Sequence, residues 1–289
     1  GLPLAPQAGY ADFIKRWWQP AQLDEAGEGV WCLGHATLLL RLHGRYLLTD
    51  PVFSTRASPL QFLGPQRKTP PALALEHLPQ PDAVLISHNH YDHLDLHSVR
   101  VIHRRFPETC FYVPLGLGPW FRQRGIRNVR ELDWWQEISE GSFTFTAVPA
   151  RHWSMRTLWD RNRSLWYGWV IESPLLRFWF SGDSGESRLL PGIVQRCGAL
   201  DAAAIPIGAF EPRWFMANHH MGPQEAVALW RDIGRPLSVP IHWGTFELAD
   251  ESLDTPPREL IAQLKRDNEN EALFFPRRIG EFVSLSRNK

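Results

Sequence analysis

Four side chains that can bind a metal ion fall within one stretch of six residues. They are His88, His90, Asp92 and His93, and they follow the short apolar run 83–86. In an extended segment, residues two apart point to the same side, so the first two imidazoles can reach one ion. The carboxylate and the third imidazole stand at the entrance to a predicted helix and could hold a second ion about 3.5–4 Å away. The stretch therefore predicts a two-metal site; a solvent-facing loop that is rich in histidine is the alternative.

Three more potential ligands stand at the ends of predicted strands. They are His152, Asp183 and His242. A single residue of this kind is usually a surface side chain, but the three together complete the ligand set of a dinuclear centre. Imidazole and carboxylate ligands suit zinc, with iron and manganese as the alternatives. A water between two such ions would ionise near neutral pH and act as the nucleophile, because single-zinc enzymes already lower the pKa of water to about 7.

Short strands with interspersed helices must position these side chains. Strands are expected at 30–42, 46–49, 83–86, 111–113, 143–148, 165–171, 176–180, 202–207 and 237–241, and helices from 94 onward, at 224–231 and at 258–266. Residues 1–27, rich in Pro, Ala and Gly, are expected to form an N-terminal arm, and residues 28–289 a single α/β domain. A layered sheet–sheet core with helices outside fits this order of elements.

The overall composition argues against nucleic acid as a partner. Lys and Arg total 31 and Asp and Glu also total 31, so the chain lacks the basic excess with which nucleic-acid binders neutralise phosphate. Three cysteines are too few for a disulfide framework. No apolar run reaches transmembrane length and no signal peptide is visible, so we expect a cytoplasmic protein. The 14 tryptophans, several beside arginine, suit either peripheral membrane contact or anchoring of core and loops.

The motif HxHxDH, followed by isolated His, Asp and His in that order, resembles the metallo-β-lactamase superfamily. The resemblance implies an αββα sandwich with two zinc ions at the mouth between the sheets. Carried over position by position, the resemblance implies three ligands for one ion, His88, His90 and His152. It implies three more for the other ion, Asp92, His93 and His242, and it makes Asp183 a carboxylate that bridges both ions. Asp50, before Pro51, is expected either to orient a ligand histidine or to cap a turn.

Longer strings resemble one family within that superfamily, the N-acylphosphatidylethanolamine-hydrolysing phospholipases D. The similar segments are 31–37, 48–53, 181–185, 211–216 and 241–246. The resemblance implies a zinc phosphodiesterase in which a metal-bridging hydroxide attacks the phosphorus of N-acylphosphatidylethanolamine, releasing N-acylethanolamine and phosphatidic acid. It also implies a homodimer and peripheral attachment, which we expect at the inner face of the membrane.

The same resemblance predicts the residues that contact the phospholipid. His220 matches a family histidine near the headgroup, so we expect it to contact the phosphate or to protonate the leaving group. The preceding family position is usually glutamine, whereas this chain has His219. Trp214, Phe215 and Met216 are expected to line a groove for the acyl chain, with a place in the core as the alternative.

Two other functions are compatible with the same ligands. A metal-dependent lactonase, or another hydrolase of soluble esters or phosphodiesters, would keep the metals and change the substrate. A zinc-stabilised binding protein without activity is the other, although a degenerate relative normally loses ligands and all seven expected ligands stand in this chain.

Overall fold

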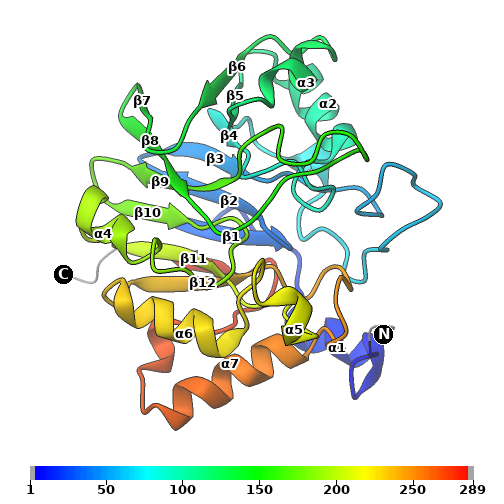
Figure 1. The fold of residues 1–289 in the computed structure, drawn as a ribbon, viewed down its shortest axis with the longest axis vertical. Helices are drawn as coiled ribbons and strands as arrows, with labels where there is room; N and C mark the ends of the chain where they lie inside the picture. The colour runs from blue at the N-terminus through cyan, green and yellow to red at the C-terminus, as the bar shows by residue number, and fades with distance from the viewer. Residues whose placement is uncertain (1–3, 286–289) are drawn as a thin grey trace.

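The computed structural model describes residues 4–285 and contains two β-sheets stacked face to face. Helices cover the outer face of each sheet, so the layers run helix, sheet, sheet, helix (Figure 1). One apolar cluster fills the space between the sheets, and two others lie beneath the helices. This arrangement confirms the predicted α/β class and the αββα sandwich.

The first sheet has seven strands in the order β13-β1-β2-β3-β4-β5-β6. Their bounds are β1 (Gly29–Gly34), β2 (Thr37–Leu42), β3 (Arg45–Thr49), β4 (Ala83–Leu85), β5 (Cys110–Pro114), β6 (Val129–Leu132) and β13 (Phe282–Ser284). The strands from β3 to β6 are parallel, and the remaining pairs are antiparallel. Because β3 and β4 run in the same direction, Asp50 at the end of β3 lies beside the segment that follows β4.

The expected strand 30–42 is two strands, β1 and β2. The chain reverses direction at Gly34 and His35, which have φ values of 134° and 57°, and the pairing register shifts there. Sequence pattern missed this turn because His35 and Ala36 are as buried as the strand residues around them. The turn brings the His35 side chain to the same edge of the sheet as the end of β4.

The second sheet has six strands in the order β12-β11-β10-β9-β8-β7. Their bounds are β7 (Glu137–Glu140), β8 (Phe143–Pro149), β9 (Tyr167–Glu172), β10 (Arg177–Phe180), β11 (Ala202–Pro206) and β12 (Leu237–Ile241). The pairs from β7 to β10 are antiparallel, and β10, β11 and β12 are parallel. Strands β8, β10 and β12 therefore end at one edge, where His152, Asp183 and His242 follow them.

Helices α2 (Leu96–Arg105) and α3 (Gly118–Arg122) cover the first sheet. Helices α4 (Gly192–Cys197), α6 (Pro223–Asp232) and α7 (Thr255–Arg266) cover the second sheet, and the short α5 (Arg213–Met216) lies near the strand ends. Helices α6 and α7 have proline in their first turn, where no intrahelical donor is lost. Asp95 caps α2 by accepting hydrogen bonds from two backbone N–H groups, which fixes where the helix begins after the histidine motif.

Alternation along single strands explains how the chain fills three apolar layers. In β2, Leu38, Leu40 and Leu42 belong to the cluster between the sheets, whereas Leu39 packs beneath α2 and α3. The indole of Trp169 in β9 donates a hydrogen bond of 3.0 Å to the carbonyl of Ile86, the residue that follows β4 of the other sheet. The two sheets are thus tied together directly behind the histidine motif.

The predicted N-terminal arm packs on the domain. Its helix α1 (Gly9–Trp17) buries Phe13 and Trp17, and the Trp17 ring meets that of Trp243 edge to face at 5.4 Å. The predicted boundaries also include residues 1–3 and 286–289, which lie outside the described residues. Within residues 4–285, no helix has the length and apolar character needed to cross a bilayer.

Candidate metal centre

The seven predicted ligands meet at one edge of the sandwich. Each follows the end of a strand: four come after β4, and the others come after β8, β10 and β12. His88, His93, His152, Asp183 and His242 are buried, and the remaining two are half-buried. Residues that are up to 154 positions apart therefore share one small volume because parallel strand ends of both sheets point to it.

Three imidazoles form the first group of donors. His88 Nε2 lies 2.9 Å from His90 Nδ1, and His152 Nε2 lies 3.2 Å from the same atom. Burial lowers the pKa of His90 to about 4 and holds the pKa of the other two imidazoles well below the usual range. All three rings are therefore neutral near pH 7, which is the form that binds a metal ion.

The second group combines one carboxylate with two imidazoles. Asp92 Oδ2 lies 3.4 Å from both His93 Nε2 and His242 Nε2, and Asp183 Oδ2 lies 3.1 and 3.0 Å from the same two nitrogens. Donors at about 2.0–2.2 Å from a tetrahedral zinc ion are separated by roughly 3.3–3.6 Å. The observed spacings are close to those of one such ion.

Asp183 stands between the two groups. Its Oδ2 is also 3.9 Å from His88 Nε2 and 3.8 Å from His152 Nε2, so a single oxygen faces imidazoles of both groups. Burial raises the pKa of this carboxyl, but the charges of His242 and His93 outweigh it and hold the pKa well below its usual range. An ionised carboxylate in this position suits a bridging ligand.

The electrostatics of the second group favour a cation. Burial disfavours charge on each member, yet the Asp183 and Asp92 carboxylates raise the pKa of His242 to about 9 and that of His93 well above its usual range. The carboxylates thus attract either protons or a metal ion to the nitrogens that face them.

Unpartnered buried atoms test whether metal ions fit. Among the described residues, His90 Nε2, His93 Nε2, His242 Nε2 and both oxygens of Asp183 are buried without a hydrogen-bond partner. Each such atom costs about 1–3 kcal/mol if nothing satisfies it. Two ions with nitrogen and oxygen ligands would satisfy most of them at once, so the residues present fit a dinuclear zinc centre.

Hydrogen bonds to the ring nitrogens that face away from the donor groups hold the predicted ligand side chains in place. Asp50 Oδ2 accepts from His93 Nδ1 at 2.6 Å, and its other oxygen accepts from the backbone N–H of Ser87 at 2.7 Å. The Ser87 hydroxyl contacts His88 Nδ1 at 2.9 Å, and His152 Nδ1 lies 3.0 Å from the carbonyl of His219. Of the two readings of Asp50, these contacts favour the orientation of a ligand histidine.

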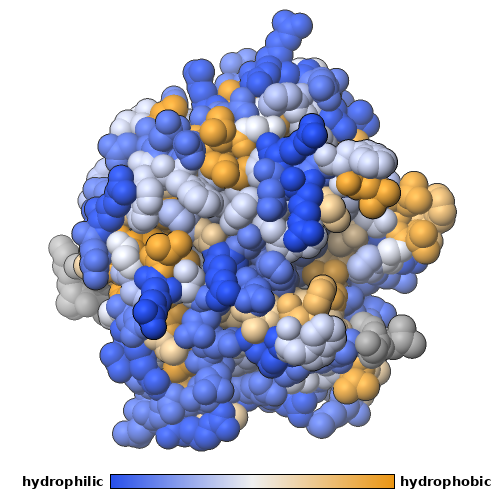
Figure 2. Space-filling view, viewed as in Figure 1, coloured by the Kyte–Doolittle hydropathy of each residue, from blue (hydrophilic) through white to orange (hydrophobic). Residues whose placement is uncertain are grey.

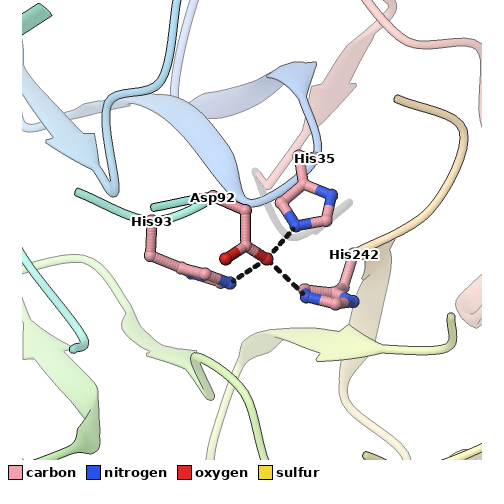
Figure 3. A group of neighbouring side chains, drawn as sticks. All are labelled: His35, Asp92, His93 and His242. Atoms are coloured by element: carbon pink, nitrogen blue, oxygen red, sulfur yellow. Dashed lines mark hydrogen bonds and ion pairs between the residues drawn. The ribbon is translucent and has the colours of Figure 1, made fainter. Parts of the chain in front are cut away.

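Sequence reasoning missed one residue of this cluster, His35. Figure 3 shows its ring with Asp92, His93 and His242, and its Nε2 lies 3.0 Å from Asp92 Oδ2. Burial, followed by the nearby His242, lowers the pKa of His35 to about 3, so its ring is neutral. The only sequence signal was its place in the family-like segment 31–37, because no spacing relates it to the other ligands.

A cavity of about 580 Å³ opens directly above the predicted metal ligands His90, Asp92 and Asp183. Its wall includes Trp153, Met155, Phe215, Met216, His219 and His220. Trp214 is 84 % exposed and is not among the residues that line this cavity, whereas Phe215 and Met216 are. The single turn of α5 turns Phe215 and Met216 toward the cavity and leaves Trp214 at the rim.

The two predicted headgroup histidines differ in their surroundings. His220 Nδ1 lies 3.8 Å from Asp183 Oδ2, and burial lowers the pKa of its ring to about 3. His219 is half-buried, and burial, with Arg151 and Arg161 nearby, lowers its pKa. His220 therefore faces the metal site as a neutral hydrogen-bonding group, and His219 stands farther out on the cavity wall.

Comparisons with known proteins place this chain in a family. The model of the family described as "Beta-lactamase superfamily domain" matches residues 45–243. N-acyl-phosphatidylethanolamine-hydrolyzing phospholipase D 1 of Caenorhabditis elegans is 40% identical over 251 residues, which are 83% of this chain and 70% of the worm protein. The mitochondrial protein of that name from Saccharomyces cerevisiae is 33% identical over 82% of this chain, which spans about half, 53%, of the yeast protein.

Solved structures carry the same fold. The metallo hydrolase Igni18 of the archaeon Ignicoccus hospitalis superposes with a TM-score of 0.66 over 89% of this chain and 97% of its own, at 19% identity. An isothiocyanate hydrolase from Delia radicum gut bacteria gives a TM-score of 0.70 over 89% of this chain and 99% of its own, at 16% identity. At such low identities the likeness concerns the fold alone.

Proposed function

The chain belongs to the N-acylphosphatidylethanolamine-hydrolysing phospholipase D family within the β-lactamase superfamily of metal-dependent hydrolases, and we propose that it is a dinuclear zinc phosphodiesterase of phospholipase D type. The proposed substrate is N-acylphosphatidylethanolamine or a close analogue, and the proposed products are N-acylethanolamine and phosphatidic acid. The observation that carries the proposal is the pairing of two donor groups, joined by Asp183, with an apolar-walled cavity directly above them.

The proposed ligand residues form two sets, one for each ion. His88, His90 and His152 would hold one zinc ion, whereas Asp92, His93 and His242 would hold the other, with Asp183 shared. When bound, the pair of ions would supply Lewis-acid chemistry, activating water as a nucleophile and drawing charge from the phosphoryl oxygens.

His220 is proposed to contact the phosphate. Its ring is neutral near pH 7, because burial lowers its pKa to about 3. A neutral imidazole can still donate one N–H to a phosphate oxygen, but it holds no extra proton to give to a leaving group. Of the two roles expected from the sequence, phosphate contact is therefore the one that its environment supports.

The surroundings of the cavity support a lipid substrate. Three segments near its mouth expose large apolar side chains: Leu60, Phe62 and Leu63 before β4, Leu158 and Trp159 after β8, and Trp214 and Phe215 in α5. Figure 2 shows apolar residues gathered around the hollow on the right, beside the projecting loop that Figure 1 draws in light blue. Exposed apolar clusters of this kind are typical of surfaces that meet a membrane or a partner. We therefore propose peripheral contact with a phospholipid surface.

The direct test is hydrolysis of a defined lipid. Purified protein is incubated with N-acylphosphatidylethanolamine in mixed micelles, with and without a chelator, and the products are identified by mass spectrometry. We expect release of phosphatidic acid that stops on chelation and returns with zinc. Turnover of a short-chain lactone, with the phospholipid left intact, would overturn the phospholipase assignment and favour the lactonase alternative.

A further inference from the structure

The backbone at His35 is held in an unusual conformation by two contacts. Its φ of 57° lies in the left-handed region, which costs a non-glycine residue free energy. The His35 N–H donates to Thr245 Oγ1 at 2.7 Å, and the His35 carbonyl accepts from the backbone N–H of His242 at 3.0 Å. The turn between β1 and β2 is thus fastened to the segment after β12, which contains a predicted zinc ligand.

This backbone directs the imidazole to a single polar partner. The His35 side chain is 1% exposed, and its Nε2 lies 3.0 Å from Asp92 Oδ2. The ring packs against that of His242 at a centroid distance of 4.1 Å and against the edge of Phe246 at 5.3 Å. Figure 3 shows three nitrogens converging on the Asp92 carboxylate, one each from His35, His93 and His242.

Distances to Asp183 separate His35 from the other two histidines. His93 Nε2 and His242 Nε2 lie 3.1 and 3.0 Å from Asp183 Oδ2 as well as 3.4 Å from Asp92 Oδ2. Within residues 4–285, His35 forms an ion pair of this type with Asp92 only. His35 therefore belongs to the same cluster of possible ligand atoms as Asp92, His93 and His242, but within this cluster it faces Asp92 and not Asp183.

We propose that His35 is a positioning residue that holds Asp92 toward the second metal ion. Its Nε2–H donates to Asp92 Oδ2 and restricts the rotation of that carboxylate, so that the oxygen faces His93 and His242. Hydrogen-bonded partners of metal ligands typically contribute 10–100-fold in metal affinity or activity. The inference rests on the proposed two-ion centre, and it assigns this contribution to one residue and to one of the two ions.

Three variants test the assignment. His35→Phe removes the donor and keeps a ring, His35→Gln keeps an N–H at nearly the same reach, and Thr245→Val loosens the turn without touching Asp92. Zinc affinity is measured by competition with a calibrated chelator, zinc stoichiometry by elemental analysis, and second-site geometry by the visible spectrum of the cobalt-substituted protein. Thermal unfolding of each metal-free variant reports the purely structural effect.

The parent protein is expected to bind two zinc ions. In His35→Phe, one of the two affinities should fall about 10–100-fold while the other is unchanged. His35→Gln should recover most of the lost affinity and the parental cobalt spectrum. Thr245→Val should unfold at a lower temperature and lose part of the same zinc affinity, because the turn that directs His35 toward Asp92 is loosened.

Other outcomes overturn the inference in distinguishable ways. Two unchanged affinities in His35→Phe would remove the positioning role and leave the proposed function intact. Equal losses in the Phe and Gln variants would make the imidazole itself a ligand. A parent protein that binds no zinc would overturn the proposed function, and this inference with it.

Discussion

Asp50 and His93 form a fully buried pair in which Oδ2 lies 2.6 Å from Nδ1. The opposite nitrogen of His93, Nε2, faces Asp183 Oδ2 at 3.1 Å. Asp50 accepts the Nδ1 proton and so determines which nitrogen of His93 is available to an ion. Because Ser87 also donates to Asp50, the carboxylate is itself held in place.

Replacing Asp50 by Asn tests this relationship. The amide is nearly the same size but neutral, and it can turn an NH₂ group toward His93, which disfavours the required tautomer. We expect a loss of about 10–100-fold in zinc affinity or activity. Chelator competition and initial rates would measure it. The matched control is Asp82→Asn, which alters a surface pair with Arg45 and a hydrogen bond from the backbone N–H of Tyr46. Parental affinity and parental rate in Asp50→Asn would remove this role from Asp50.

The proposed shared ligand, Asp183, predicts the largest single effect. Asp183→Asn keeps the shape of the side chain and removes the charge that faces imidazoles of both donor groups. We expect turnover to fall by at least about 100-fold, with bound zinc reduced from two ions toward one or none. Elemental analysis of the gel-filtered variant and product release from the phospholipid would check both parts. A variant with two bound ions and more than about a tenth of the parental rate would contradict the bridging role.

Acid should destabilise the metal-free protein. Burial lowers the pKa of His35 to about 3, of His90 to about 4 and of His220 to about 3 in the folded state, whereas an unfolded histidine titrates near its ordinary value of about 6.5. The unfolded chain therefore binds more protons below that pH. The contribution of these three histidines to stability is fully present above about pH 6.5 and falls as the pH drops toward 4, by about 1.4 kcal/mol per pH unit for each of them.

Calorimetry in the presence of a chelator would measure this dependence. The midpoint of thermal unfolding should fall steadily between pH 6.5 and pH 4.5, and zinc should raise it more at the upper end of that range, since protons compete with the ion for the same nitrogens. A midpoint that is constant or rises toward acid pH would show that these histidines are not buried in neutral form.

Replacing each of the two predicted headgroup histidines in turn separates their roles. His220→Ala removes a donor that faces the metal site, and we expect kcat to fall about 100-fold with two zinc ions still bound. His219→Gln introduces the residue usual in the family at a position farther out on the cavity wall, and it should keep most of the activity. Steady-state kinetics with the phospholipid, together with metal analysis, would decide. Equal losses in the two variants would contradict a specific role for His220.

The exposed apolar side chains predict binding to vesicles. A triple variant of Phe62, Trp159 and Trp214 to serine should bind phospholipid vesicles at least about tenfold more weakly, because each ring loses about 1–3 kcal/mol of apolar burial in the membrane. Turnover of a short-chain substrate in solution should remain. Leu175→Ser, at an exposed position in the turn between β9 and β10 and thus at the far end of β10 from Asp183, is the matched control. Equal vesicle binding by the parent and the triple variant would place the membrane contact elsewhere.

Much of the fold follows from local pattern. The apolar runs predicted most of the strands, and the helices after β11 and β12 begin near the prolines that suggested them. The strands that sequence pattern missed, β6, β7 and β13, are short and lie at or next to sheet edges, where burial imposes little alternation. The turn at His35 was missed for the opposite reason, since burial continues through it.

The sequence by itself determined the chemistry of the centre, because the spacing of His88, His90, Asp92 and His93 is a local property of an extended segment that enters a helix. It also supplied the other three candidate ligands, each recognisable as a polar residue after an apolar strand. Only the tertiary structure decided which residues form hydrogen bonds with these candidate ligands. Asp50 meets His93 across 43 residues, and His35 meets Asp92 across 57. Such contacts depend on strand order, direction and register, which arise from the packing of two whole sheets and not from any short stretch of chain.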